Sequence, residues 1–168
     1  MDKKRKKINK KNTRPSWDEY FINIARETAR RATCNKRQFG AVIVGDKRII
    51  ATGYNGSPVG LAHCLDKGCY EIDTHCVRTL HAEMNAILQV ALQSQNLASF
   101  NDLTIYIAGP GQPCLLCTKL IIGAGIKRIV CEKIYRPKEH QKEYEFVDKI
   151  LKEAGVKLEE YKISDYNK

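Results

Sequence analysis

His81-Ala82-Glu83 and the later run Pro113-Cys114-Leu115-Leu116-Cys117 decide how this 168-residue chain folds and what chemistry it can perform. One imidazole and two thiolates at a Cys-x-x-Cys spacing supply three ligands for a tetrahedral zinc ion. Three protein ligands leave a fourth position for water, which is typical of a catalytic zinc rather than a closed structural one. Glu83 is not needed as a ligand, so its carboxylate is free to carry protons. The alternative is a structural zinc knuckle or two unrelated cysteines.

Both stretches are predicted to begin helices, over residues 81–92 and 114–124, because apolar side chains recur there at helical spacing. Cys114 and Cys117 then lie one turn apart, in a first turn whose free N–H groups and dipole favour thiolates. If the two helix starts face each other, the metal lies between them. Cys131 stands in an apolar strand and is expected in the core.

The other elements follow from local signals. Ser16 and Glu19 form a capping box that predicts a helix to about residue 32. Apolar side chains at helical spacing between residues 146 and 154 predict a last helix that ends at residue 154. Apolar runs predict strands over residues 39–44, 48–52, 103–108, 126–131 and 156–161. The first two strands form a hairpin, and the later ones alternate with helices. This order predicts an α/β fold, a three-layer α-β-α sandwich with a mixed, about five-stranded sheet.

Most of the net charge of +10 lies at the start of the chain. Residues 1–14 contain eight lysines and arginines against Asp2, a net +7, so the other 154 residues carry only +3. A run of like charges is typical of a disordered segment. We therefore expect a disordered basic tail over residues 1–13, making at most weak contacts with nucleic acid. Residues 14–168 are expected to form a single domain.

The composition excludes several classes of protein. A hydrophobic content of 43% and a mean hydropathy of −0.43 are typical of a globular domain with one core. No apolar run approaches the length of a membrane span. The lysine-rich start is not followed by the apolar stretch of a secretory leader. Seven cysteines in such a chain favour metal ligands or reduced thiols over disulfides. We expect a cytoplasmic protein.

Four runs carry a family resemblance: residues 14–21 (RPSWDEYF), 40–44 (GAVIV), 53–58 (GYNGSP) and 81–87 (HAEMNAI). Over residues 14–160 the chain resembles the deoxycytidylate (dCMP) deaminases of the zinc-dependent cytidine/deoxycytidylate deaminase family, in particular their bacterial competence-operon type. His-Ala-Glu with Pro-Cys-x-x-Cys is shared by the zinc nucleobase deaminases in general. The Gly-Tyr-Asn-Gly-x-Pro and His-Ala-Glu-x-Asn-Ala-Ile runs point to the dCMP branch. The resemblance implies a cytidine deaminase-like fold.

The resemblance implies that the chain hydrolyses dCMP to dUMP and ammonia, supplying dUMP for thymidylate synthesis. In that reaction His81, Cys114 and Cys117 hold the zinc. Glu83 moves a proton from water to the base and then to the departing ammonia. General acid/base catalysis of this kind is worth roughly 10² to 10⁴ in rate.

The resemblance also implies nucleotide contacts and regulation. Asn55 matches a residue that hydrogen-bonds the sugar hydroxyl, although an asparagine between glycines is also common in turns. Ala82 and Tyr135 match further substrate positions. The family is typically a hexamer that dCTP activates and dTTP inhibits, which would make such a chain a homo-oligomer. A loop formed by Gly53, Tyr54, Asn55 and Gly56 is implicated in that regulation.

Residues 53–79 are predicted to be a long loop rich in Gly, Cys and His, which needs either a function or something to order it. Some relatives carry a second, structural zinc in this region. A closed site of four ligands would order the loop and tie it to the first helix. The alternative is a set of reduced, partly buried thiols. The candidate ligands, among which the sequence does not choose between His75 and Cys76, are Cys34, Cys64, Cys69, His75 and Cys76.

The chain departs from the family's pattern beside the cysteine pair. Residues 109–112 lengthen the connection between the preceding strand and Pro113, and Ala108 replaces a strand-end threonine. Phe39 stands where relatives often have valine. Because these positions line the pocket near the base, they bear on which substrate fits.

Two alternative functions remain open at this point. A tRNA adenosine deaminase of the same superfamily would use the same zinc chemistry, and the basic tail favours it. The Gly-Tyr-Asn-Gly run and the lack of a basic patch around the site count against it. A zinc-stabilised nucleic-acid-binding module without catalysis would have no need of Glu83.

Overall fold

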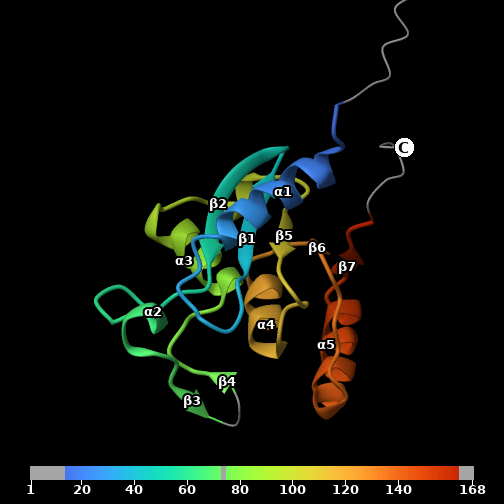
Figure 1. Cartoon of the computed structure of the whole chain (residues 1–168). Helices are drawn as coiled ribbons and strands as arrows, with labels where there is room; N and C mark the ends of the chain where they lie inside the picture. Colours follow the sequence, from blue (N-terminus) through green and yellow to red (C-terminus); the bar gives the residue numbers. More distant parts are fainter. Residues whose placement is uncertain (1–13, 73–74, 163–168) are drawn as a thin grey trace, which may run out of the picture.

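The computed structural model describes residues 14–72 and 75–162, apart from the side chain of His75. The basic tail expected over residues 1–13 lies outside the described residues. Five strands form the main sheet in the order β2-β1-β5-β6-β7 (Figure 1). They are β1 (Gly40–Gly45), β2 (Arg48–Tyr54), β5 (Thr104–Ala108), β6 (Arg128–Cys131) and β7 (Lys157–Glu160). β1 pairs antiparallel with β2 and β5, whereas β5, β6 and β7 are parallel, so the sheet is mixed as predicted.

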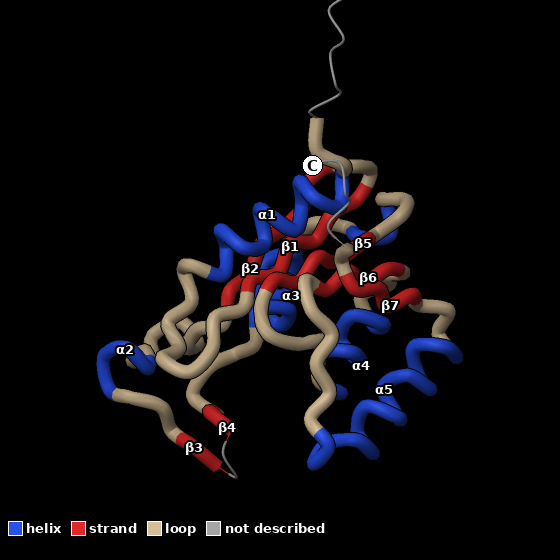
Figure 2. The backbone as a smooth tube through the Cα atoms, turned by 45° about the vertical axis from the view of Figure 1, so that its right-hand side comes forward, coloured by secondary structure: helices blue, strands red, loops and turns tan. Residues whose placement is uncertain are grey.

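Helices cover both faces of the sheet, which confirms the three-layer sandwich (Figure 2). The helices are α1 (Trp17–Ala29), α3 (Ala82–Leu92), α4 (Leu115–Gly123) and α5 (Gln141–Glu153). α1 lies alone on one face, and the other three lie on the opposite face. No helix among the described residues is long and apolar enough to cross a membrane.

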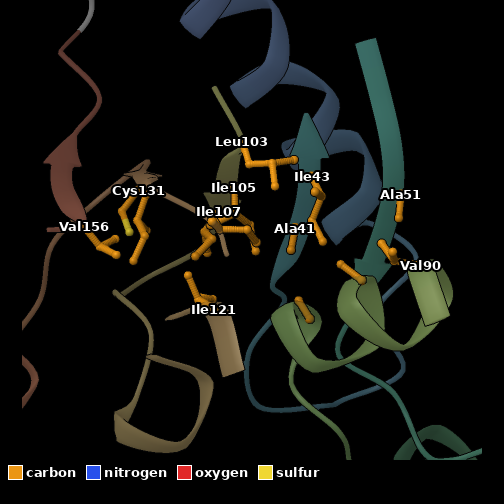
Figure 3. Packing of buried hydrophobic residues seen from close by; sticks show 14 of the residues in the cluster. Ala41, Ile43, Ala51, Val90, Leu103, Ile105, Ile107, Ile121, Cys131 and Val156 are labelled. Atoms are coloured by element: carbon orange, nitrogen blue, oxygen red, sulfur yellow. The ribbon is translucent and has the colours of Figure 1, made fainter. Parts of the chain in front are cut away.

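Every residue of β1 is buried because both faces of the strand are covered. Side chains alternate along a strand, so Val42 and Val44 pack toward α1 while Ala41 and Ile43 pack toward the other three helices. Figure 3 shows the larger core, where Ile107 of β5 lies near Ile121 of α4. Cys131, fully buried in this core, is the packing residue that the sequence predicted.

Two element boundaries differ from the prediction. The Ser16 hydroxyl accepts the Glu19 N–H at 3.1 Å, as the capping box requires, but α1 ends at Ala29 rather than near residue 32. Beyond Ala29 the backbone N–H groups bond three residues back instead of four, which tightens the chain into a turn. β2 continues to Tyr54, two residues further than expected, because Gly53 and Tyr54 still pair with β1.

The predicted loop over residues 53–79 holds short elements of its own. They are α2 (Cys64–Lys67), β3 (Glu71–Ile72) and β4 (His75–Cys76), the last two paired antiparallel. These elements lie to one side of the main sheet (Figure 1). They were not predicted because none carries a periodic apolar face.

Candidate metal centre and active site

The two predicted ligand segments meet at the starts of α3 and α4. His81 is the N-cap of α3, Cys114 is the N-cap of α4, and Cys117 lies in the first turn of α4. His81 Nδ1 is 3.3 Å from Cys117 Sγ and 3.6 Å from Cys114 Sγ. The helix starts therefore face each other as the sequence analysis required.

The geometry of these three atoms fits zinc. With Zn–S bonds of about 2.3 Å and Zn–N bonds of about 2.0–2.1 Å, a tetrahedral site separates its sulfur and nitrogen ligands by roughly 3.6 Å. The observed separations of 3.3 and 3.6 Å are close to that value. The ligand atoms of all three residues lie within 4.8 Å of one another. His81, Cys114 and Cys117 would therefore hold the ion without rearrangement.

The three groups are electrostatically coupled. The hydrogen bond with Cys114 raises the pKa of His81 to about 9. Hydrogen bonds from Cys117 and His81 lower the pKa of Cys114 to about 4 despite its burial. The neighbouring Cys114 raises the pKa of Cys117. A bound zinc ion would displace the protons that remain on His81 and Cys117, because metal ligands must be deprotonated.

Glu83 faces the inside of the protein, with only 4% of the residue exposed. Burial raises the pKa of its carboxyl group, while the nearby His81 opposes that shift. Among the described residues, Glu83 belongs to neither of the two groups of side chains that could hold a metal ion. Its position two residues after His81 places it beside the metal centre without coordinating, which suits a proton carrier.

The start of α3 is fixed by direct backbone contact with β2. A Cβ atom added to Gly53 would lie 2.3 Å from the Ala82 carbonyl oxygen and 2.3 Å from the Ala86 nitrogen. Gly56 pairs with Leu80, the residue before His81, and Asn85 Nδ2 donates to the Tyr54 carbonyl at 2.7 Å. Gly53 and Tyr54 therefore belong to the sheet rather than to a loop, and the segment positions His81.

Asn55 is buried, and both the oxygen and the nitrogen of its side-chain amide form hydrogen bonds with the backbone of residues 37–39. Oδ1 accepts the Phe39 N–H at 2.8 Å, and Nδ2 donates to the Arg37 carbonyl at 2.9 Å. These bonds join Asn55 to residues 16 and 18 positions earlier in the chain, so they are tertiary contacts rather than the local turn contact considered for this residue. The bond to Arg37 uses one of the two hydrogens that Nδ2 carries. Ala82, also predicted to contact substrate, is the buried first residue of α3.

Two of the three departures from the family pattern, Phe39 and the longer 109–112 segment, contact each other. A Cβ atom on Gly109 would lie 2.5 Å from Phe39 Cδ1, and one on Gly111 would lie 3.9 Å from Phe39 Cζ. The Phe39 ring therefore supports the longer 109–112 segment. Gly109 has φ of +133°, a conformation open mainly to glycine. The aromatic side chain and the extra length of the connection form one structural unit.

The segment from the end of β6 to the first turn of α5 contributes three charged residues that hydrogen-bond to the chain around Cys114 and that no sequence pattern indicated. Glu132 Oε2 accepts the Gly109 N–H at 3.0 Å. Arg136 Nε donates to Gln112 Oε1 at 3.2 Å, and Glu143 Oε1 accepts the Leu115 N–H at 2.9 Å. These residues lie far from Cys114 in the chain, so no local sequence motif could have identified them. Tyr135, predicted to contact the nucleotide, lies beside Arg136 and is 49% exposed.

A second group of ligand atoms lies between α1 and the short elements. The thiols of Cys34, Cys64, Cys69 and Cys76 lie within 4.8 Å of one another, and Cys64 Sγ is 3.6 Å from Cys76 Sγ. The Lys36 backbone N–H donates to Cys34 Sγ at 3.4 Å. The structure thus brings together four of the five candidates. The side chain of the fifth, His75, lies outside the described residues.

A cavity of about 600 Å³ lies between this cysteine group and the 109–112 segment, lined by residues 34–38, Leu65 and Pro110. Two of its lining residues, Lys36 and Arg37, are basic, and Lys36 pairs with Glu71 at 2.6 Å. Arg37 and Arg136 both oppose the rise in the pKa of Tyr144 that burial causes, and Cys114 adds to that rise.

Comparison with known proteins gives concordant matches. A family model, the cytidine and deoxycytidylate deaminase zinc-binding region, matches residues 15–133. The chain is 41% identical over 152 residues to ComE operon protein 2 of Bacillus subtilis (strain 168), covering 90% of this chain and 75% of that protein. It is 38% identical over 133 residues to the deoxycytidylate deaminase of Mycobacterium phage D29, covering 72% and 98%. The crystal structure of dCMP deaminase from the cyanophage S-TIM5 in complex with dCMP and dUMP has a TM-score of 0.69 at 26% identity, covering 88% and 98%.

Proposed function

Because the chain belongs to the cytidine and deoxycytidylate deaminase zinc-binding family, we propose that it is an enzyme that converts dCMP and water to dUMP and ammonia. The observation that carries the proposal is the convergence of His81 Nδ1 with two thiols at 3.3 and 3.6 Å, beside the buried carboxyl group of Glu83. The phage relative named deoxycytidylate deaminase and the cyanophage structure with dCMP and dUMP support the choice of substrate.

Zinc held by His81, Cys114 and Cys117 would supply a Lewis acid that makes water nucleophilic at neutral pH. Glu83 accepts a proton from the attacking water and delivers it to the ring nitrogen of cytosine. Glu83 then takes the remaining proton from the hydroxyl group added to the base and transfers it to the amino group. The C–N bond breaks, ammonia leaves, and the hydroxyl oxygen becomes the carbonyl oxygen of uracil. The burial of Glu83 keeps bulk water from competing for these protons.

The remaining nucleotide contacts are also proposals. Asn55 donates through the second hydrogen of Nδ2 to the sugar hydroxyl, and Ala82 and Tyr135 line the nucleotide. We place the phosphate in the cavity bordered by Arg37, because guanidinium groups bind phosphate strongly. Replacing Arg37 with alanine should raise KM for dCMP at least 10-fold while leaving turnover of deoxycytidine, which lacks the phosphate, unchanged. Equal effects on both substrates would contradict this placement.

The decisive measurement is ammonia release from dCMP, dCTP, cytidine and tRNA. We expect turnover of dCMP, and conversion of RNA alone would favour the tRNA adenosine deaminase alternative. Glu83→Ala should abolish turnover while retaining the zinc and the fold, because the carboxylate is not a ligand. A non-catalytic zinc module predicts no turnover in the unmodified protein and no effect of that substitution.

We also propose a second, structural zinc held by Cys34, Cys64, Cys69 and Cys76. Four thiols within 4.8 Å of one another match the donor set of closed structural sites. The ion would tie the start of α2 and β4 to the chain that follows α1. Counting zinc per chain in the unmodified protein and in Cys64→Ser should give two and one. An unchanged count in the variant would remove this site.

Assembly and regulation complete the proposal. The segment that carries α2, β3 and β4 exposes a set of large apolar side chains of the kind that interfaces cover. They are Val59, Leu61, Leu65, Tyr70, Ile72 and Val77. We propose a homo-oligomer of the hexameric size typical of the family, acting in the cytoplasm, and light scattering would measure its mass. Activation by dCTP and inhibition by dTTP are to be tested as changes in dCMP turnover.

A further inference from the structure

Among the described residues, three buried side-chain atoms lack a hydrogen-bond partner, and all three lie in segments next to the metal centre. Ser57 follows the segment that pairs with Leu80, Gln112 precedes Pro113 and Cys114, and Thr118 follows Cys117. Buried polar atoms without partners are uncommon in native proteins because each costs free energy. Gln112 and Thr118 lie within two residues of Cys114 and Cys117, so a ligand at the metal centre is a candidate partner for their unpaired atoms.

Gln112 is the most informative of the three because its orientation is fixed. Its Oε1 accepts from Arg136 Nε at 3.2 Å. A guanidinium group can only donate hydrogen bonds, so the amide oxygen of Gln112 must face it and the amide Nε2 must point elsewhere. Arg136 is itself held by Asp148 through two bonds of 2.6 and 2.8 Å. The Gln112 amide group is therefore fixed in one orientation and cannot exchange the positions of its oxygen and its unpaired nitrogen.

The backbone that carries Gln112 is held from several sides. Glu132 accepts the Gly109 N–H, and the Phe39 ring lies against Gly109 and Gly111. Two residues of extended chain span roughly 7 Å, so the Cα atom of Gln112 lies within that distance of the Cα atom of Cys114. Gln112 therefore lies close enough to the metal centre for its side chain to reach a nucleotide bound there.

We propose that Gln112 is a substrate-binding residue whose Nε2 amide donates a hydrogen bond to an acceptor oxygen of the bound pyrimidine nucleotide. The inference rests on the proposed function, because it requires a nucleotide at the metal centre. The base carbonyl, the sugar and the phosphate of such a nucleotide all present acceptor oxygens. Nε2 is closed off from solvent, so we expect the part of the segment between the held Gly109 and Pro113 to shift slightly when a nucleotide binds, which Gly111 permits.

Two substitutions separate this role from a purely structural one. Gln112→Glu keeps an oxygen for Arg136 but replaces the donor with an acceptor, and Gln112→Met removes both groups at similar volume. A residue that only anchors Arg136 would tolerate Glu and suffer from Met. A substrate donor is lost in both. We expect kcat/KM for dCMP to fall about 10- to 100-fold in both variants, with zinc content unchanged. Gln89→Glu, on an exposed part of α3, is the matched control.

Affinity for dUMP, measured by calorimetry, tests the same contact without requiring turnover. We expect binding about 10-fold weaker or worse in both Gln112 variants and unaffected in Gln89→Glu. If the unmodified protein binds dUMP but deaminates nothing, the proposed reaction fails, and weaker binding in the variants still supports the contact. Affinity and kcat/KM within twofold of the unmodified protein in Gln112→Glu would overturn the inference. So would the absence of nucleotide binding in the unmodified protein.

Discussion

Glu143 in the first turn of α5 accepts the backbone N–H of Leu115 at 2.9 Å, the residue that follows the metal-ligand candidate Cys114. A carboxylate thereby caps the N-terminus of the helix that carries both cysteines. The contact satisfies one of the free N–H groups at that helix start and adds negative charge beside the helix dipole. It ties the position of Cys114 to a residue 29 positions further along the chain.

Loss of this cap should weaken metal binding. Glu143→Ala leaves the Leu115 N–H without its acceptor and frees the start of α4, so we expect zinc affinity to fall about 10-fold, as for other residues that orient ligands. Glu143→Gln retains an acceptor oxygen and should lose much less. Competition with a chelator of known affinity measures both variants. Equal losses in the two would show that the charge rather than the hydrogen bond matters.

Gly53 should not accept a side chain. Its added Cβ would lie 2.3 Å from backbone atoms of α3, which cannot move away as a flexible side chain could. Gly53→Ala is expected to destabilise the fold by at least about 2 kcal/mol and to lower dCMP turnover, since the displaced helix carries Glu83. Gly123→Ala meets nothing within 4 Å and should stabilise α4 by about 0.5–1 kcal/mol. Chemical denaturation of the two variants provides the comparison.

The packing of Phe39 against Gly109 predicts coupling between the two positions. Gly109→Ala places a Cβ atom 2.5 Å from the ring at a φ of +133°, and should cost about 1–3 kcal/mol. Phe39→Val removes the ring and with it the closest clash, but neither the contact with the Gln38 carbonyl oxygen at 2.9 Å nor the backbone strain. The double variant should therefore be less unstable than the sum of the single variants. Strict additivity in the three unfolding free energies would contradict the contact.

An acid dependence follows from Asp18. Arg128 holds its carboxylate through bonds of 2.7 and 2.8 Å, and the Tyr106 hydroxyl donates to it at 2.8 Å. The hydrogen bonds from Arg128 lower the pKa of Asp18 even though burial opposes the shift. A lowered folded-state pKa contributes stability that is present above the unfolded value of about 4 and is lost as the pH falls through the folded value.

Asp18→Asn tests this dependence. The substitution should cost about 1–2 kcal/mol at pH 7, because the pair is partly exposed. The difference from the unmodified protein should shrink below about pH 4. Asp102→Asn, at an exposed turn of positive φ that asparagine tolerates, is the control expected to change little. Urea denaturation across pH 3–7 measures both, and a pH-independent difference for Asp18→Asn would count against the ion pair.

Local patterns predicted most of the fold. The capping box at Ser16, the hairpin of the first two strands and the alternation of later helices and strands all appear in the structure. The misses have local causes as well. After Ala29 the backbone changes from α-helical hydrogen bonds to bonds three residues back, and no glycine or proline marks this helix end in the sequence. The short elements between Cys64 and Cys76 are too small to show periodicity.

By itself the sequence determined the chemistry available to this protein, because His81, Glu83, Cys114 and Cys117 lie in short motifs whose spacing fixes their place on helix starts. Only the tertiary structure decided what surrounds them. The gathering of four cysteines, the hold of Arg136 on Gln112 and the cap of Glu143 on Leu115 each join segments that lie apart in the chain. Such contacts arise from the packing of helices on a sheet, and no local spacing of residues encodes them.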